Sequence, residues 1–337
     1  MYESEVTNTA TPDPIVFNWR TWAFLGIVVM ALSSFGPTTI VAPVPLVFAF
    51  LIFGRARGFI LGGVCFGLST VLSLSYMNHL GAVGFLLFSL VIAIAISEII
   101  LRGIAPDRGL IIVGFFIFAF AMGCIGIYML WGQNMMKNYV NDFFVIRAES
   151  LMKEHADFIA KGGEQARMVE DLLKNPKKLV AEFFKWLPAM FFISMFLTVW
   201  FNFFIVLRGS MIWKRVRTYG FTLRHMLIFK TPDFCVWMLI GALAVILGGE
   251  FVLGTFSGTG HVIAMNILYC LGAYYFIQGF GIFYEFLFFL KISGFLRAMF
   301  LVVTVFFAFR VLVFVGLFDM WVNFRKFFKK INKNKGE

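Results

Sequence analysis

The chain has 337 residues, of which 61% are hydrophobic and only 14% are charged, whereas about a quarter of the residues of an ordinary soluble domain are charged. This composition excludes a soluble globular protein and predicts one that lies in a lipid bilayer. The net charge of +11 suggests nucleic-acid binding as an alternative, but the positive residues stand in short stretches beside apolar runs. Membrane proteins place Lys and Arg in this way, so we expect no nucleic-acid partner.

Apolar runs of about 20 residues, long enough to cross the hydrocarbon core as a helix, recur along the chain. The runs are continuous and do not alternate with polar residues, which favours helices over the strands of a barrel. We therefore predict an all-α fold, a polytopic transmembrane helix bundle of eight or nine spans with an extramembrane helical insertion. The predicted spans are 21–38, 43–54, 58–76, 81–101, 109–131, 186–207, 233–253, 262–290 and 298–318.

This pattern divides the chain into four regions. We expect N-terminal membrane helices over residues 1–131, an extramembrane amphipathic helical segment over 132–183, C-terminal membrane helices over 184–318, and a basic tail over 319–337. The whole protein is expected in the cell (inner) membrane.

A proline-rich break separates the first two runs. Hydroxyl and proline residues follow one another there, namely Ser33, Ser34, Pro37, Thr38, Thr39, Pro43 and Pro45. The second run is short, so it forms either a half-helix or a continuation of the first. Hydroxyl groups can satisfy backbone groups that a helix break releases, and transporters build binding sites at broken helices.

The charged loops predict which side of the membrane each loop occupies. Basic residues mark three loops as cytoplasmic, namely Arg55 and Arg57, Arg102 and Arg108, and the series Arg208, Lys214, Arg215, Arg217, Arg224 and Lys230. The intervening loops 77–81 and 254–261 carry no charged residue. The basic tail should also be inside, but three spans after the third basic loop would place it outside. Either the last apolar stretch is re-entrant or interfacial, or one span is miscounted; we expect a cytoplasmic tail.

Residues 132–183 carry eight basic and eight acidic residues and have apolar positions at helical spacing, with a break at Gly162-Gly163. The alternation of loops places this segment outside. It forms either a lid over an outward-facing cavity or a solvated amphipathic hairpin on the lipid headgroups, and we favour the hairpin.

Polar residues inside apolar spans are the candidate ligand-binding residues, because polar groups at membrane depth are costly. Asn266 and Tyr269 share one face of the run 262–290, and Tyr274 and Gln278 share another, with Glu285 two turns further along it. Asn202 is the candidate in the run 186–207. The alternative is that these side chains form interhelical hydrogen bonds that fix the packing, each contributing on the order of 1 kcal/mol.

Two charged groups near the membrane need partners. Arg102 follows Glu98 by four residues, which predicts an ion pair on one helix face. Arg310 lies inside the last apolar run and keeps its proton, and Glu285 is a candidate partner for it if the two helices pack together.

Motifs of the common enzyme classes are missing from the sequence. We find no His-Glu-x-x-His, no Gly-x-Ser-x-Gly, no P-loop and no dinucleotide fingerprint, and the four cysteines form no Cys-x-x-Cys or Cys/His cluster. We therefore expect no enzyme, no catalytic residue, no metal site and no cofactor. Any active transport would draw on an ion gradient or a partner ATPase.

The last third of the chain carries a resemblance to a known family. The relevant residues are Pro232, Trp237, Asn266, Tyr275-Phe276-Ile277-Gln278-Gly279-Phe280-Gly281, Leu317-Phe318-Asp319-Met320-Trp321 and Phe324-Arg325. They resemble the YybS-like bacterial membrane proteins, and the Tyr-Phe-x-Gln-Gly element is the most specific part. That family is similar to the substrate-binding membrane subunits of energy-coupling-factor vitamin transporters.

The resemblance implies a pocket that opens to the outside, with Asn266 and Gln278 among its polar residues. It also implies a separate ATPase module, docked on small-residue helix faces such as Gly63 with Gly67, or Ala119 with Gly123. The sequence thus favours a small-molecule binding or transport subunit that works with partner membrane proteins. The alternative is a structural or scaffold protein of the cell envelope.

Overall fold

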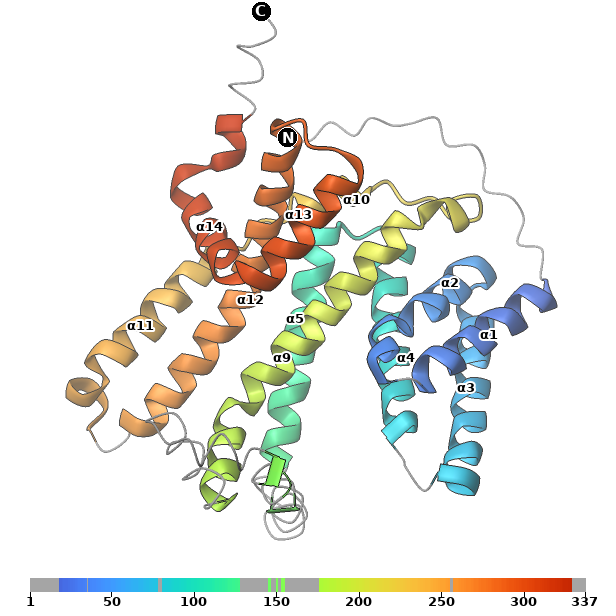
Figure 1. The fold of residues 1–337 in the computed structure, drawn as a ribbon, viewed down its shortest axis with the longest axis horizontal. Helices are drawn as coiled ribbons and strands as arrows, with labels where there is room; N and C mark the ends of the chain where they lie inside the picture. Colours follow the sequence, from blue (N-terminus) through green and yellow to red (C-terminus); the bar gives the residue numbers. More distant parts are fainter. Residues whose placement is uncertain are drawn as a thin grey trace, which may run out of the picture. The chain divides into compact units, whose positions relative to one another are not determined.

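The structure is a computed structural model, and it describes residues 18–34, 36–77, 81–127, 145–146, 150, 153–154, 176–254 and 257–328. The regular elements of these residues are all helices (Figure 1). The chain divides into two compact units, and the helices α5 (Pro106–Ile127), α9 (Pro176–Arg208) and α12 (Ser257–Phe289) each run through both. One unit comprises Met1–Val113, Met195–Thr231 and Ala273–Glu337, and the other comprises Gly114–Ser194 and Pro232–Gly272.

The first unit begins with a helix that is broken near its middle. The helix α1 (Trp19–Ser34) is followed by the 3₁₀ helix η1 (Gly36–Val41) and the short helix α2 (Pro43–Phe53). The second predicted run is therefore a separate half-helix. Eleven residues span only about 16 Å, about half of the hydrocarbon core. Nearly all of α2 is buried, because α1, α3 (Arg55–Leu72) and α4 (Gly81–Leu101) pack around it.

The remaining elements follow in chain order after α9. They are η4 (Ser210–Ile212), α10 (Leu223–Leu227), α11 (Phe234–Leu253), α12, α13 (Gly294–Phe307) and α14 (Phe309–Val322); a π-helical turn, η2 (Ser73–Met77), follows α3. Most of the predicted extramembrane segment 132–183 lies outside the described residues, and its last eight residues form the first two turns of α9.

Four helices of the described residues are long and apolar enough to cross a membrane, namely Arg55–Ser75, Val83–Leu101, Phe183–Arg208 and Ser257–Phe289. A fifth is obtained if α13 and α14, which meet at an angle of 96°, form one broken span. For the described residues, the prediction of an all-helical protein with helices long and apolar enough to span a membrane is confirmed, whereas the number of eight or nine spans is not. Three predicted runs, 21–38, 43–54 and 233–253, fall on shorter apolar helices, and the run 298–318 bends at Ala308.

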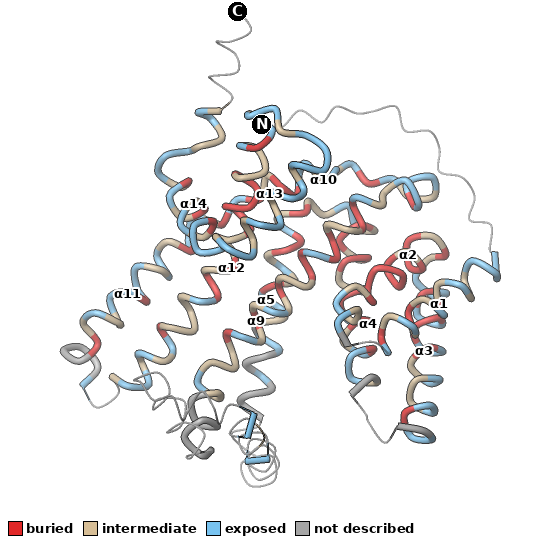
Figure 2. Tube along the Cα trace, in the orientation of Figure 1, coloured by how far each residue is buried: buried red, intermediate tan, exposed pale blue. Residues whose placement is uncertain are grey.

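Apolar side chains cover much of the surface, as expected where the surroundings are lipid. No residue of α13 is buried, and Phe295, Phe306 and Phe307 are between 76% and 86% exposed (Figure 2). The helix α11 likewise exposes Trp237 and Leu247. Aromatic and aliphatic groups exposed to this extent in a row are typical of helices that contact acyl chains or another apolar protein surface.

The three basic loops meet at one end of the first unit. Arg217 of the third loop donates from Nε to the carbonyl of Leu51 over 3.2 Å, and the Tyr219 hydroxyl donates to the carbonyl of Ile104 over 2.8 Å. Burial raises the pKa of the Tyr219 phenol, and the negative charge of Asp107 raises it further. These contacts hold the third loop against the ends of α2 and α4, as expected if all three basic loops face one side of the membrane.

The predicted ion pair of Glu98 is confirmed at that same end. Its two carboxylate oxygens each lie 2.7 Å from an arginine Nε, one from Arg102 on the same helix and one from Arg55 at the start of α3. Glu98 therefore joins α4 to the turn between α2 and α3.

Candidate functional site

The break between α1 and α2 uses hydroxyl groups to satisfy backbone carbonyls. Ser34 donates from Oγ to the carbonyl of Met30, and Thr38 donates from Oγ1 to the carbonyl of Leu32, each over 2.8 Å. The carbonyl of Leu32 is one of the last four of α1, which have no helical partner, whereas the Ser34 hydroxyl bonds back to a carbonyl that the helix itself satisfies. The role predicted for the hydroxyl residues around Pro37 is therefore confirmed for Thr38.

Asn202 reaches this break from the last two turns of α9, a helix long and apolar enough to span a membrane. It is 0% exposed, and its Nδ2 donates to the carbonyl of Ile40 in η1 over 2.7 Å and to that of Thr198 over 2.8 Å. Two donated bonds fix the orientation of the amide, so its Oδ1 points away from both carbonyls. That oxygen is buried and has no hydrogen-bond partner. The structure therefore brings together the proline-rich break and Asn202, which the sequence suggested as separate candidates.

Two further buried oxygens near the break also lack partners. Ser33 lies in the last turn of α1 and Ser89 on α4, and they are 4% and 1% exposed. The helices α2 and α4 pack together and both run toward the ion pair of Arg55 with Glu98. Ser89 precedes Glu98 by nine residues, or about 14 Å of helix, and α2 is about 16 Å long, so these lengths allow Ser89 to lie near the start of α2. The contact of α4 with η1 agrees with this position.

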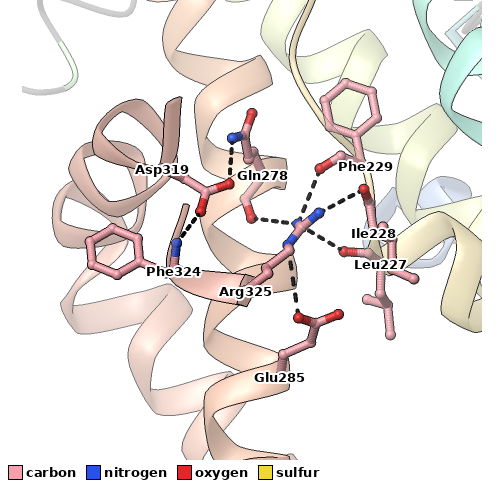
Figure 3. Close-up of polar contacts among 8 residues, drawn as sticks. All are labelled: Leu227, Ile228, Phe229, Gln278, Glu285, Asp319, Phe324 and Arg325. Carbon is pink, nitrogen blue, oxygen red and sulfur yellow. Dashed lines mark hydrogen bonds and ion pairs between the residues drawn. The ribbon is translucent and has the colours of Figure 1, made fainter. Parts of the chain in front are cut away.

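A second polar cluster lies at the C-terminal half of α12 (Figure 3). Gln278 is 0% exposed; its Oε1 accepts the N–H of Thr231 over 2.8 Å, and its Nε2 donates to Oδ2 of Asp319 over 3.0 Å. The other oxygen of Asp319 accepts the N–H of Phe324 over 2.9 Å, just after α14 ends. One amide thus ties α12 to α14 and to the segment that precedes α11.

Arg325 closes the same cluster from the start of the basic tail. Its guanidinium donates to the carbonyls of three consecutive residues, Ile228 at 2.7 Å, Phe229 at 3.1 Å and Leu227 at 3.3 Å, and to that of Gln278 at 3.5 Å. A cation at this position complements the C-terminal end of α10. We call the set of Gln278, Glu285, Asp319 and Arg325 with residues 227–231 the α12 junction.

Glu285 corrects the prediction that it pairs with Arg310. Glu285 lies 3.9 Å from Nε of Arg325, and Arg310 is exposed and lies over the ring of Phe309 instead. The sequence offered Arg310 because it stands inside an apolar run, but α14 turns that side chain outward, where it can reach lipid headgroups.

The helices α12 and α14 approach backbone to backbone next to the junction. A Cβ on Gly279 would collide with the carbonyl of Leu312, and one on Gly316 would collide with that of Tyr275. Only glycine permits this contact, because any side chain would force the two backbones apart.

The remaining predicted site residues on α12 contact α9 or the third loop. Asn266 accepts the N–H of Ala189 over 3.0 Å and donates to the carbonyl of Lys185 over 2.8 Å. These two groups are an i, i+4 pair next to Pro188, so Asn266 supports a helix at its proline. The half-exposed Tyr269 packs its ring on Trp186, and Tyr274 packs between Phe196 and Phe229.

The three amides among the five candidate residues thus fall into two groups. The polar atoms of Asn266 and Gln278 are bonded to protein groups, which is the interhelical alternative for both, whereas Asn202 keeps one buried acceptor without a partner. Sequence reasoning missed Ser89, which nothing distinguishes from any serine in an apolar run. Asp319 and Arg325 entered only through the resemblance, although Asp319 is an acidic residue at the end of an apolar run, which is a signal by itself.

Comparison with known proteins places the chain. The model of the family described as Predicted membrane protein (DUF2232) matches residues 22–320. The chain belongs to this DUF2232 family. The matched region includes the break, Asn202, Gln278 and Asp319, and it ends five residues before Arg325. No curated protein and no solved structure matches the chain significantly.

No acidic, histidine or cysteine side chains come together in the described part of this DUF2232 protein in a group of three or more that could hold a metal ion. An apolar groove of about 270 Å³ lies between α11 and α12. Small residues such as Gly241, Ala242, Gly260 and Ala264 form much of its walls. The break is therefore the place where uncompensated polar atoms, rather than space alone, indicate a function.

Proposed function

We propose that this protein is a non-enzymatic small-molecule binding or transport subunit of the cell (inner) membrane, with its binding site at the break between α1 and α2. One observation carries the proposal: Asn202 Oδ1, Ser33 Oγ and Ser89 Oγ are buried there without partners. Each such atom costs about 1–3 kcal/mol when it is left unsatisfied. Native proteins keep such groups where a ligand, an ion or water completes the hydrogen bonds.

The helix break itself supports the proposal. A break inside an apolar bundle exposes backbone groups that would otherwise be satisfied within the helix, and transporters use such breaks to bind polar ligands. The resemblance to YybS-like proteins, and through them to energy-coupling-factor binding subunits, leads to the same class of function.

A partner protein is part of the proposal. Gly63 and Gly67 lie exposed on one face of α3, and no neighbouring atom stands within 4 Å of where their Cβ atoms would be. Close helix packing in membranes uses such small residues. We propose that this face binds a partner membrane protein or ATPase module.

A ligand screen tests the binding function. We expect the melting temperature of the purified protein to rise with one class of compound from a panel of vitamins and nucleosides, because a ligand that binds only the folded state stabilises it. Ser33→Ala is expected to remove this shift and to leave the protein folded. If no compound in a broad panel stabilises the protein, the binding function is contradicted.

The scaffold alternative rests on the exposed apolar surfaces of α11 and α13, which could equally contact another envelope protein. A scaffold predicts that partners co-purify at fixed stoichiometry while the ligand screen stays negative. Co-purification of an ATPase would instead favour transport.

We further propose that the basic tail is cytoplasmic and that α13 and α14 form a re-entrant pair. The 96° bend and the contact of Arg325 with residues 227–229 support this topology, because the third basic loop is the most strongly basic one. A re-entrant pair places the basic tail on the same side as the basic loops and does not require an additional span.

Reporter fusions test the topology. A reporter at the C-terminus that is active only in the cytoplasm is expected to be active, and the same reporter within residues 132–183 is expected to be inactive. An inactive C-terminal fusion in a chain that still expresses would show that α13 and α14 together cross the membrane.

A further inference from the structure

The break between α1 and α2 offers few N–H groups to a ligand. Two of the first four residues of α2 are proline, Pro43 and Pro45, so two of the N–H groups that normally face outward from a helix start are missing. Ser34 Oγ, Thr38 Oγ1 and Asn202 Nδ2 already donate to backbone carbonyls. The unpartnered side-chain atoms of Asn202, Ser33 and Ser89 are all oxygens, and each has lone pairs that a cation can use.

The helix α1 and the unpartnered side chains also determine the electrostatic character of the break. The C-terminal end of α1 points into the break and carries the negative end of its helix dipole. The unpartnered side-chain atoms are an amide oxygen on Asn202 and two hydroxyl oxygens on Ser33 and Ser89, and all of them are uncharged. A site built from neutral oxygens and a helix C-terminus favours a hard cation of low charge, since a divalent ion prefers carboxylate ligands.

We propose that the break binds a monovalent metal cation, sodium, with Asn202 Oδ1, Ser33 Oγ and Ser89 Oγ as side-chain ligands. Carbonyl groups at the end of α1 complete the shell. Binding satisfies the three buried oxygens together and fixes α1, α4 and α9 against η1. If the proposed transport function holds, this ion supplies the gradient to which transport is coupled, and only that coupling role rests on the proposed function.

Melting curves of the full chain in detergent or lipid nanodiscs test the cation site. Sodium chloride is compared with choline chloride at equal ionic strength, so that only the specific ion changes. At a sodium concentration about ten times the Kd, we expect the melting temperature to rise by about 3 °C over the choline sample. Equal melting temperatures in the two salts overturn the proposal.

Serine variants locate the ion with a matched control. Ser33→Ala and Ser89→Ala each remove one ligand and an otherwise unsatisfied hydroxyl, so both are expected to fold and to lose at least half of the sodium shift. Ser97→Ala is the control, because Ser97 is also buried and unpartnered on α4 but lies eight residues beyond Ser89. A full shift in Ser89→Ala, or an equal loss in Ser97→Ala, overturns the location.

Asn202 is not used as a test, because Asn202→Leu would remove the proposed ligand and break the bond to Ile40 at the same time. The serine variants therefore test where the ion binds. The sodium result is independent of the ligand screen. A sodium shift without any small-molecule hit keeps the cation site and contradicts the binding subunit. A small-molecule hit together with equal melting temperatures in the two salts keeps the binding subunit and contradicts the cation site.

Discussion

Gly279→Ala is expected to reduce the stability of the protein by about 3 kcal/mol or more, because the new methyl group would collide with the backbone carbonyl of Leu312. A backbone carbonyl in a packed helix cannot rotate away as a side chain can. The expected results are a large fall in the melting temperature and a low yield of folded protein from membranes. Gly316→Ala, on the other side of the same contact, is expected to act in the same way.

The control for this prediction is Gly272→Ala on the same helix. No atom stands within 4 Å of a Cβ at that position, so the substitution is expected to leave the melting temperature unchanged or raise it slightly, as alanine favours a helix. If Gly279→Ala melts within about 2 °C of the unmodified protein, the close contact between α12 and α14 does not exist.

Gln278→Leu is expected to reduce stability by about 2–4 kcal/mol, since it leaves two buried partners without their bonds, the N–H of Thr231 and the carboxylate of Asp319. Leucine is similar in size, so lost packing contributes little. The measurement is chemical or thermal unfolding of the purified protein, with helix content checked by circular dichroism.

A double-mutant cycle with Asp319→Ala, which removes the acceptor, separates the contact from general damage. The two side chains touch over 3.0 Å, so the coupling energy is expected to lie between about 0.5 and 3 kcal/mol. Strictly additive losses would show that Gln278 and Asp319 do not interact, and a stable Gln278→Leu would contradict the junction altogether.

The helical class and the shared faces of α12 could be predicted from the sequence. Spacing placed Tyr274, Gln278 and Glu285 on one stripe, and the structure turns all three toward the same neighbours. Tyr274 packs on Phe229, Gln278 bonds to Thr231, and Glu285 pairs with Arg325, which itself binds residues 227–229. A period of 3.6 residues determines which side chains point together.

The partners of that stripe could not be predicted in the same way. They are backbone groups such as the N–H of Thr231 and the carbonyl of Ile40, and a backbone group has no signature in the sequence. Asn202 therefore appeared as an isolated polar residue, and its position at the break, 162 residues away in the chain, depends on tertiary packing.

The bend between α13 and α14 could not be predicted either, because it has no local signal in the sequence. Ala308 stands among apolar residues, with no proline or glycine beside it, so the run reads as one continuous span. The contact of α14 with α12 through Gly316 and Gly279 accompanies the bend, and that contact joins helices far apart in sequence. The acidic residue Asp319, and the basic tail that begins at Arg325, were the remaining sign that this end of the chain is not an ordinary span.

The position of Arg325 has a consequence for biogenesis. Its carbonyl partner Leu227 is synthesised 98 residues earlier, so the whole of α11, α12, α13 and α14 must be made before the guanidinium is available. Until then the carbonyls of residues 227–229 do not have Arg325 as a hydrogen-bond donor, and water or lipid headgroups must take its place. Translation that stops before residue 325 would therefore deliver a chain with every long apolar helix synthesised and the contacts of Arg325 absent, a product that quality-control proteases could recognise by the unfastened segment 227–229.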